Sequence, residues 1–257
     1  MDASLHRKPR RRKLPAGVLQ RCALLDRDMS LRAILLDIEG TTTPIAFVHD
    51  VLFSYAREHV REFLAENPDA EDIALLREEH ATESDAPPLT DQIESIAAYV
   101  EWLIKLDRKS TALKSLQGKI WRQGYQEGSL KSQVFADVKP AFARWRERGL
   151  RIGIFSSGSV LAQQLLFAHT EVGDLTPFID SYFDTKVGKK GEAESYRKIA
   201  ETMGLSPEEI LFVSDVVVEL DAARQAGMQS LLSIRPGNEP QPHEEQYPAI
   251  RGFEEIL

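Results

Sequence analysis

Four short apolar runs, separated by longer and more polar stretches, dominate the hydrophobic pattern of the chain. They are residues 33–36 (AILL), 152–155 (IGIF), 210–213 (ILFV) and 230–234 (SLLSI). A strand of a parallel sheet is covered by helices on both faces, so its sequence is continuously apolar rather than alternating. The four runs therefore predict the central strands of a parallel sheet.

Helical segments are predicted between these runs. Residues 140–148, 193–203 and 219–226 carry apolar side chains at helical spacing, and each segment is followed within a residue by a glycine, which commonly ends a helix. Strands that alternate with helices are typical of an open, mostly parallel α/β sheet.

The stretch from about residue 47 to residue 133 has a different pattern. It contains no strand-like run, and its apolar residues recur every three or four positions, as in Ile93, Ile96 and Val100. We interpret it as a small helical domain inserted after the first strand. The predicted parts are an α/β core at 29–46 and 134–257, the helical insert at 47–133, and a tail at 1–28.

Composition and charge narrow the class of protein. The 257 residues are 42% hydrophobic and 28% charged, as in soluble globular proteins, and no apolar run approaches the roughly 20 residues that span a bilayer. The only cysteine, Cys22, excludes an intrachain disulfide and fits a reducing compartment. The first 13 residues lack the apolar section of a secretory signal, so we expect a cytoplasmic protein.

The charge of the chain is unevenly distributed. Residues 1–13 hold six basic side chains and one acid, which leaves a net charge of −13 in residues 14–257. An acidic body repels phosphate backbones, so neither a nucleic-acid nor a membrane partner is expected. The basic run is read as a solvated tail, with a nuclear-import signal or a tether to an anionic surface as alternatives. Nothing in the sequence sets the oligomeric state, and a monomer is the default expectation.

Polar side chains that can carry out chemistry follow three of the predicted strands. Asp37 and Glu39 follow the first, Ser156 and Ser157 the second, and Asp215 the third. Ligands of open parallel sheets bind beyond the carboxyl ends of the strands, so these side chains are expected to share one site. Between the second and third strands lie three further candidates, Lys186, Lys189 and Lys190.

The residue types in this set favour phosphoryl transfer. Asp37, Glu39 and Asp215 would repel one another without a cation, and Mg²⁺ prefers oxygen ligands and accepts phosphate oxygens. Ser156, Ser157 and a lysine can hold the remaining phosphate oxygens. The predicted reaction is attack by Asp37 on phosphorus, followed by hydrolysis of the aspartyl phosphate, with Glu39 as general acid and base.

The candidate residues lie in five longer segments of characteristic sequence. They are LLDIEGTTTPIAFVHDVLF (35–53), FSSGSVLAQQLLF (155–167), FDTKVGKKGEAESYRKIA (183–200), ILFVSDVVVELDAA (210–223) and RPGN (235–238). These segments resemble the haloacid-dehalogenase superfamily of aspartate-nucleophile phosphatases. The closer likeness is to the acireductone-forming enolase-phosphatases of methionine salvage, and it covers about residues 31–238.

The resemblance implies a Rossmann-like sheet whose helical insert is a cap domain. It implies Mg²⁺ at Asp37, Glu39 and Asp215, and substrate contacts from Ser156, Ser157 and Lys190. It also implies two steps on 2,3-diketo-5-methylthiopentyl 1-phosphate, enolisation and then dephosphorylation, which yield 1,2-dihydroxy-3-keto-5-methylthiopentene.

Several alternatives stay open at this point. Three lysines lie within five positions, at 186, 189 and 190, so the lysine of the site depends on how this segment is aligned with the superfamily. Lys190 is the expected one. Glu219 stands where the superfamily more often has Asp. We expect its carboxylate to interact with the positive end of the helix dipole rather than to belong to the site. An apolar substrate tail would be contacted by aromatic residues of the insert, such as Phe47, Tyr55 or Trp121. The alternative functions are a generic phosphatase of the same superfamily and a phosphate-binding module without catalysis.

Overall fold

A computed structural model describes residues 31–68, 71–106, 108 and 110–256. The predicted tail at 1–28 lies outside the described residues. Among those described, no helix has the length and apolar character needed to cross a membrane.

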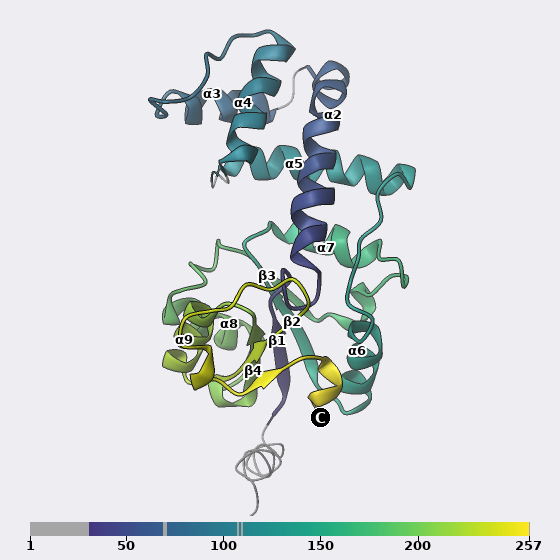
Figure 1. Cartoon of the computed structure of the whole chain (residues 1–257), viewed down its shortest axis with the longest axis vertical. Coiled ribbons are helices and arrows are strands. Elements are labelled where there is room, and N and C mark those ends of the chain that lie inside the picture. The colour runs from purple at the N-terminus through teal and green to yellow at the C-terminus, as the bar shows by residue number, and fades with distance from the viewer. Residues whose placement is uncertain (1–30, 69–70, 107, 109, 257) are drawn as a thin grey trace, which may run out of the picture.

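Six strands form one parallel sheet in the order β3-β2-β1-β4-β5-β6 (Figure 1). They are β1 (Ala33–Leu36), β2 (Arg151–Phe155), β3 (Ser181–Phe183), β4 (Ile210–Ser214), β5 (Gln229–Ser233) and β6 (Ala249–Ile250). The four predicted strands are confirmed within a residue or two at each end. The two strands that the pattern missed, β3 and β6, lie at the two edges of the sheet.

Helices cover both faces of this sheet (Figure 1). The long ones are α6 (Val138–Glu147), α7 (Val160–Ala168), α8 (Ala193–Met203) and α9 (Val217–Ala226), and the short turns are η2 (Thr176–Phe178), η3 (Pro207–Glu209), η4 (Glu244–Gln246) and η5 (Phe253–Glu255). Alternate residues of β1 point to opposite faces: Ile34 packs in the core with Phe142 of α6, whereas Leu35 packs with Tyr196 of α8. The predicted α/β class is therefore confirmed, with a separate apolar core on each face.

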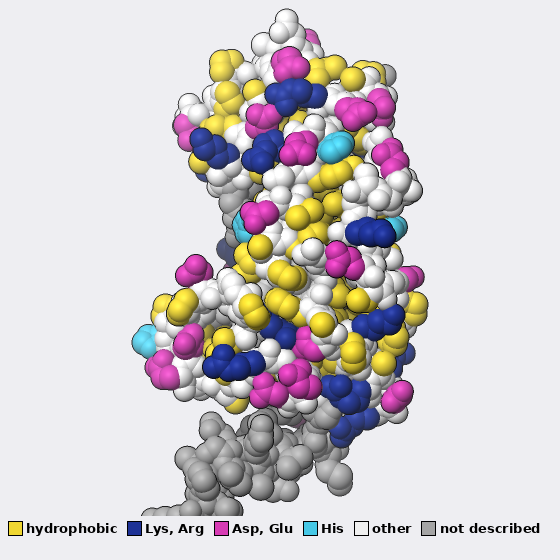
Figure 2. Space-filling model, turned by 45° about the vertical axis from the view of Figure 1, so that its right-hand side comes forward, with side chains coloured by type: hydrophobic (Ala, Val, Ile, Leu, Met, Phe, Trp, Pro, Cys, Tyr) yellow, Lys and Arg dark blue, Asp and Glu magenta, His cyan; other side chains and the backbone are white. Residues whose placement is uncertain are grey.

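The insert is helical, as predicted. It contains η1 (Phe47–Leu52), a π-helical turn, followed by α2 (Phe53–Glu66), α3 (Glu71–His80), α4 (Ile93–Lys105) and α5 (Thr111–Glu127). Val60, Ile96 and Leu116 belong to an apolar core of its own. Trp121 packs instead in the core on the α6 side of the sheet, so the base of the insert is joined to the α/β core. In Figure 2, apolar side chains gather on the visible face between the upper, helical part and the lower part that contains the sheet.

Candidate active site

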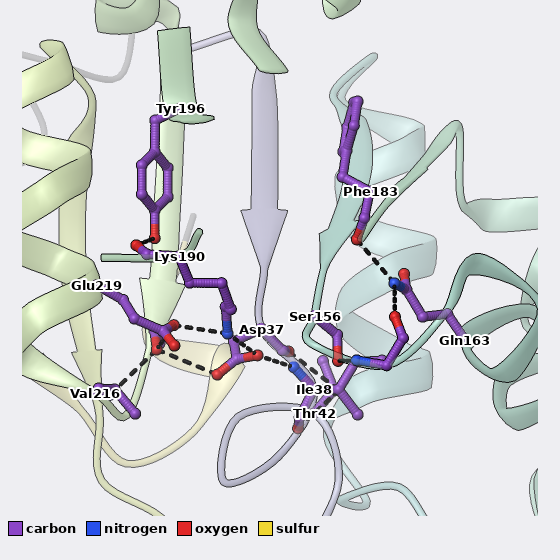
Figure 3. Close-up of polar contacts among 12 residues, drawn as sticks. Asp37, Ile38, Thr42, Ser156, Gln163, Phe183, Lys190, Tyr196, Val216 and Glu219 are labelled. Carbon is purple, nitrogen blue, oxygen red and sulfur yellow. Dashed lines mark hydrogen bonds and ion pairs between the residues drawn. The ribbon is translucent and has the colours of Figure 1, made fainter. Parts of the chain in front are cut away.

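The parallel register brings three predicted site segments to one edge of the sheet. Leu36 pairs with Ile154 of β2 and with Val213 of β4, so Asp37 lies level with the ends of both neighbouring strands. Figure 3 shows Asp37 between Lys190 and Glu219 on one side and Ser156 on the other. The predicted convergence of strand ends is therefore present in the fold.

Asp37 is buried and held by several hydrogen-bond donors. Its Oδ1 accepts from the Lys190 ammonium at 2.6 Å and from the backbone N–H of Ile38 at 2.7 Å. Its Oδ2 accepts from the Ser214 hydroxyl at 3.3 Å. These bonds fix the direction of the carboxylate, which is a requirement for in-line attack on a bound substrate.

The lysine at the site is Lys190. Its side chain is 9% exposed, and besides Asp37 it contacts the Glu219 carboxylate at 2.7 Å. Burial lowers the pKa of Lys190, but the charges of Asp37 and Glu219 outweigh burial and raise the pKa above the ordinary lysine value. Lys186 is exposed, and Lys189 is 84% exposed and pairs with Glu192. The Tyr196 hydroxyl donates to the Lys190 carbonyl at 2.8 Å, which anchors this register to α8.

Glu219 is part of the site, so the expectation that it only serves the helix dipole is wrong. It does lie in the first turn of α9, but its side chain points toward the sheet. Its carboxylate accepts from Lys190, and it lies 2.9 Å from the Ser214 hydroxyl, whose single hydrogen it shares with Asp37. Burial and the nearby charge of Asp37 raise the pKa of Glu219 to about 7. Glu219 therefore positions Lys190 from the side opposite Asp37.

Asp215 follows β4 and approaches the loop after Asp37 very closely. A Cβ atom added to Gly40 would lie 2.3 Å from Asp215 Oδ2 and 3.0 Å from Asn238 Oδ1. Gly40 also has a φ of +67°, so this position favours glycine for both its backbone and its neighbours. Burial, then the charges of Asp37 and Glu219, raise the pKa of Asp215 to about 7. The loop is thus packed directly against this carboxylate.

The last residue of β5 and the residues that follow it hold the same loop from a third side. Ser233 and Asn238 donate to the carbonyl of Gly40, at 3.2 and 2.9 Å, and the Arg235 side chain donates to the carbonyl of Thr41 at 3.2 Å. Arg235 is 6% exposed and also pairs with Asp137. The RPGN segment therefore supports the loop that carries Asp37.

The loop after β2 presents hydroxyl and amide groups. The N–H of Gly158 donates to Ser156 Oγ at 3.1 Å, which leaves the Ser156 O–H as a donor for a ligand. Gln163 of α7 is 1% exposed, and its amide donates to the carbonyls of Gly158 and Phe183 (Figure 3). Gln163 therefore fixes the shape of this loop, a role that the sequence pattern gave no reason to expect.

A cavity of about 270 Å³ lies between the insert and this loop. From the core it is lined mainly by Ile38, Glu39 and residues 156–159. The insert contributes apolar side chains together with His49, Arg108, Lys114 and Gln117. Asp37, Asp215 and Lys190 do not line it; it begins one residue from Asp37. Among the aromatic residues expected to meet an apolar substrate tail, Trp121 lines the cavity, whereas Phe47 and Tyr55 do not. The insert contributes Phe53 instead, whose ring stacks on that of Trp121 at 6.5 Å.

The site has an excess of negative charge that a divalent cation would neutralise. Asp37 and Asp215 are buried, and Glu219 has a side chain that is 13% exposed. Two of these three carboxylates, those of Asp37 and Glu219, contact the same ammonium group, that of Lys190. Over the described residues, however, no three carboxylate, imidazole or thiolate side chains converge as a ready-made metal site. Mg²⁺ commonly takes only one or two protein carboxylates and fills its other positions with water and phosphate oxygens. Asp37 and Asp215 fit that requirement, and the role of Glu39 as a ligand stays a prediction.

Comparison with known proteins identifies the family. A model of the haloacid dehalogenase-like hydrolases matches residues 31–227. The chain belongs to this family. Enolase-phosphatase E1 of Synechococcus elongatus is 56% identical over 218 residues, which are 82% of this chain and 91% of that protein. Enolase-phosphatase E1 of Sorangium cellulosum is 50% identical over 207 residues, 80% of this chain and 89% of that protein. Within the hydrolases, the chain is therefore a member of the enolase-phosphatase group.

Solved structures support the same fold. The crystal structure of UTR4 protein from Saccharomyces cerevisiae superposes with a TM-score of 0.74 at 37% identity, covering 88% of this chain and all of that one. The structure of CbbY from Rhodobacter sphaeroides in complex with phosphate has a TM-score of 0.55 at 16% identity, covering 88% of this chain and 96% of that one. The second likeness concerns the fold alone.

Proposed function

We propose that the protein is a magnesium-dependent enolase-phosphatase of methionine salvage. Its substrate would be 2,3-diketo-5-methylthiopentyl 1-phosphate, and its products 1,2-dihydroxy-3-keto-5-methylthiopentene and phosphate. Relatives at up to 56% identity carry the name enolase-phosphatase E1. The observation that carries the proposal is the Asp37 carboxylate, which is held 2.6 Å from the Lys190 ammonium beside the loop that presents Ser156.

In the proposed reaction Asp37 is the nucleophile. The phosphate oxygens are held by the hydroxyl and amide groups of Ser156 and Ser157 and by the Lys190 ammonium. Lys190 also neutralises negative charge that develops on these oxygens in the transition state. An Asp37 oxygen then forms a bond to phosphorus as the ester oxygen leaves. Water hydrolyses the resulting acyl phosphate and restores the carboxylate.

Glu39 is the proposed general acid and base. It lies two residues after Asp37 and lines the cavity, where a leaving oxygen and an attacking water would both be located. In this role it protonates the leaving oxygen in the first step and takes a proton from water in the second.

The proposed metal ligands are Asp37, Glu39 and Asp215. Bound Mg²⁺ would supply positive charge to the phosphate oxygens and so reduce their repulsion of the nucleophile. The raised pKa values of Asp215 and Glu219 support a cation here, since burial and then the neighbouring charge of Asp37 disfavour the ionised carboxylates, and a bound cation would offset both effects.

Two other functions are the alternatives to this proposal. A generic phosphatase of the same family would use the same residues on another phosphoester, and a phosphate-binding module would have no use for a buried nucleophile beside Lys190. We expect a monomeric, cytoplasmic enzyme whose partner is the small phosphorylated substrate.

The test is to assay the purified protein with the diketo phosphate and Mg²⁺. We expect release of phosphate together with an oxygen-sensitive enediol, and loss of both products in Asp37→Asn. The control Asp50→Asn changes an exposed carboxylate of the insert and should behave as the wild type. Hydrolysis of p-nitrophenyl phosphate without conversion of the diketo phosphate would leave the generic phosphatase as the function.

A further inference from the structure

One ammonium group of the insert reaches the core at the cavity. Lys114 of α5 donates through Nζ to the carbonyl oxygen of Ser157 at 3.0 Å. Both residues line the cavity, and Ser157 belongs to the loop that is proposed to hold the phosphate. A positive charge of the insert therefore lies directly beside the phosphate-holding loop.

The charge of Lys114 is available to a ligand. Among the lysine and arginine side chains in the described part of the chain, the other one that lines the cavity is Arg108. Arg108 lies 3.4 Å from Glu83 and 3.3 Å from Asp85, so nearby carboxylates already neutralise it. Lys114 forms no ion pair with any carboxylate that the structure describes, and its partner at Ser157 is a neutral carbonyl. Because an ammonium group has three N–H donors, a substrate oxygen can accept a hydrogen bond from Lys114 beside that carbonyl or in its place.

The proposed substrate has a keto oxygen close to its phosphate. Only the ester oxygen and C1 separate phosphorus from the C2 carbonyl carbon. A substrate whose phosphate is held by the loop at 156–158 would therefore place its C2 oxygen near a group that is bonded to that same loop. Lys114 meets this description.

We propose that Lys114 is a catalytic residue of the enolisation step, an inference that rests on the proposed function. Its ammonium donates a hydrogen bond to the C2 keto oxygen and stabilises the negative charge that forms there. An oriented donor at such a position typically contributes about 100-fold to 1000-fold in rate.

The step conserves atoms and electrons. Glu39, which lines the same cavity, removes a proton from C1, and the electrons of the C1–H bond form the C1=C2 double bond. The electron pair of the C2 carbonyl moves to its oxygen, where the Lys114 ammonium stabilises it while keeping its own protons. Glu39 then returns the proton to the C2 oxygen, so the keto compound becomes its enol without another reactant.

The test separates enolisation from phosphate transfer in Lys114→Met. With the diketo phosphate, kcat should fall about 100-fold, while kcat for p-nitrophenyl phosphate, which needs no enolisation, should stay within about threefold of the wild type. Deuterium at C1 should slow the variant more than it slows the wild type, because removal of that hydrogen becomes rate-limiting. Lys114→Arg keeps a positive donor and should restore part of the lost rate.

The control variant is Arg122→Met, which removes an exposed positive charge from the same helix and should leave both reactions unchanged. Undiminished conversion of the diketo phosphate by Lys114→Met would overturn the proposal. A parallel loss of both reactions would also overturn it, because it would show that Lys114 serves only to join the insert to the core. Failure of the wild type to convert the diketo phosphate would instead reject the proposed substrate.

Discussion

The contact between Gly40 and Asp215 allows a sharp test of how the site is assembled. In Gly40→Ala the new Cβ would lie 2.3 Å from Asp215 Oδ2 and 2.6 Å from its Cγ, well inside van der Waals contact. The backbone φ of +67° adds strain of about 1–2 kcal/mol for any residue with a Cβ. Because the clashing atoms are the end of a side chain, we expect Asp215 to move rather than the loop to unfold.

Gly204→Ala is the matched control. Gly204 has a φ of +62°, close to that of Gly40, but nothing lies within 4 Å of an added Cβ. Both variants should therefore lose about 1–2 kcal/mol of unfolding free energy from the backbone strain. Only Gly40→Ala displaces a proposed metal ligand, and a displacement of about 1 Å at a catalytic group commonly costs about 100-fold in rate.

The assay is phosphatase activity as a function of Mg²⁺ concentration, with urea unfolding measured in parallel. We expect Gly40→Ala to need at least about tenfold more Mg²⁺ and to lose about 100-fold in kcat/KM at limiting Mg²⁺, whereas Gly204→Ala keeps the wild-type Mg²⁺ dependence. Identical Mg²⁺ dependence in the two variants would refute the reasoning that places Asp215 in the metal site.

Three further predictions concern the buried charges. Lys190→Met leaves the carboxylates of the site without their cation, so the free energy of unfolding in urea, measured without Mg²⁺, should fall by about 3–5 kcal/mol. The control Lys189→Met changes an exposed side chain and should alter the free energy of unfolding by less than about 0.5 kcal/mol. Glu219→Gln removes the negative charge beside Lys190 but keeps the shape of the side chain. The Lys190 ammonium then loses its fixed position, so phosphatase activity should fall by about tenfold or more. An unchanged kcat/KM would contradict the positioning role of Glu219. The pKa values of Asp215 and Glu219 are raised to about 7 in the folded protein, so the native state binds more protons than the unfolded state between about pH 4 and 7. In thermal unfolding without Mg²⁺, the stability of the protein should therefore fall as pH rises through that window, by up to about 1.4 kcal/mol per pH unit for each group. Stability that rises with pH in this window would contradict the assignment.

Much of the fold follows from short-range pattern. The run at 33–36 is apolar throughout because both faces of β1 are buried, and this signature is local. By contrast, β3 has three residues and β6 has two, so neither offers enough positions for a periodic pattern. Both are strands only because they pair with a longer neighbour, which is information that the local sequence does not contain.

The site residues likewise fall into those that the local sequence predicts and those that it does not. Asp37, Ser156 and Asp215 were predictable because each follows a strong strand signal, and parallel strands end at the same edge. The orientation of Glu219 was not predictable: an acid in the first turn of a helix satisfies the dipole whichever way its side chain points, and the packing of α9 on the sheet decides the direction. Lys114 was missed for a similar reason, since it contacts Ser157 across 43 positions of the chain.

The central claim is that Asp37 forms a covalent bond to phosphorus. The most direct test is to mix enzyme, Mg²⁺ and substrate, quench within one turnover in acid, and reduce the acyl phosphate with borohydride before peptide mass spectrometry. The account predicts homoserine in place of aspartate at position 37 in the wild type, and its absence when substrate is omitted. Full turnover with no modification at position 37, or with the modification at another carboxylate, would contradict the account.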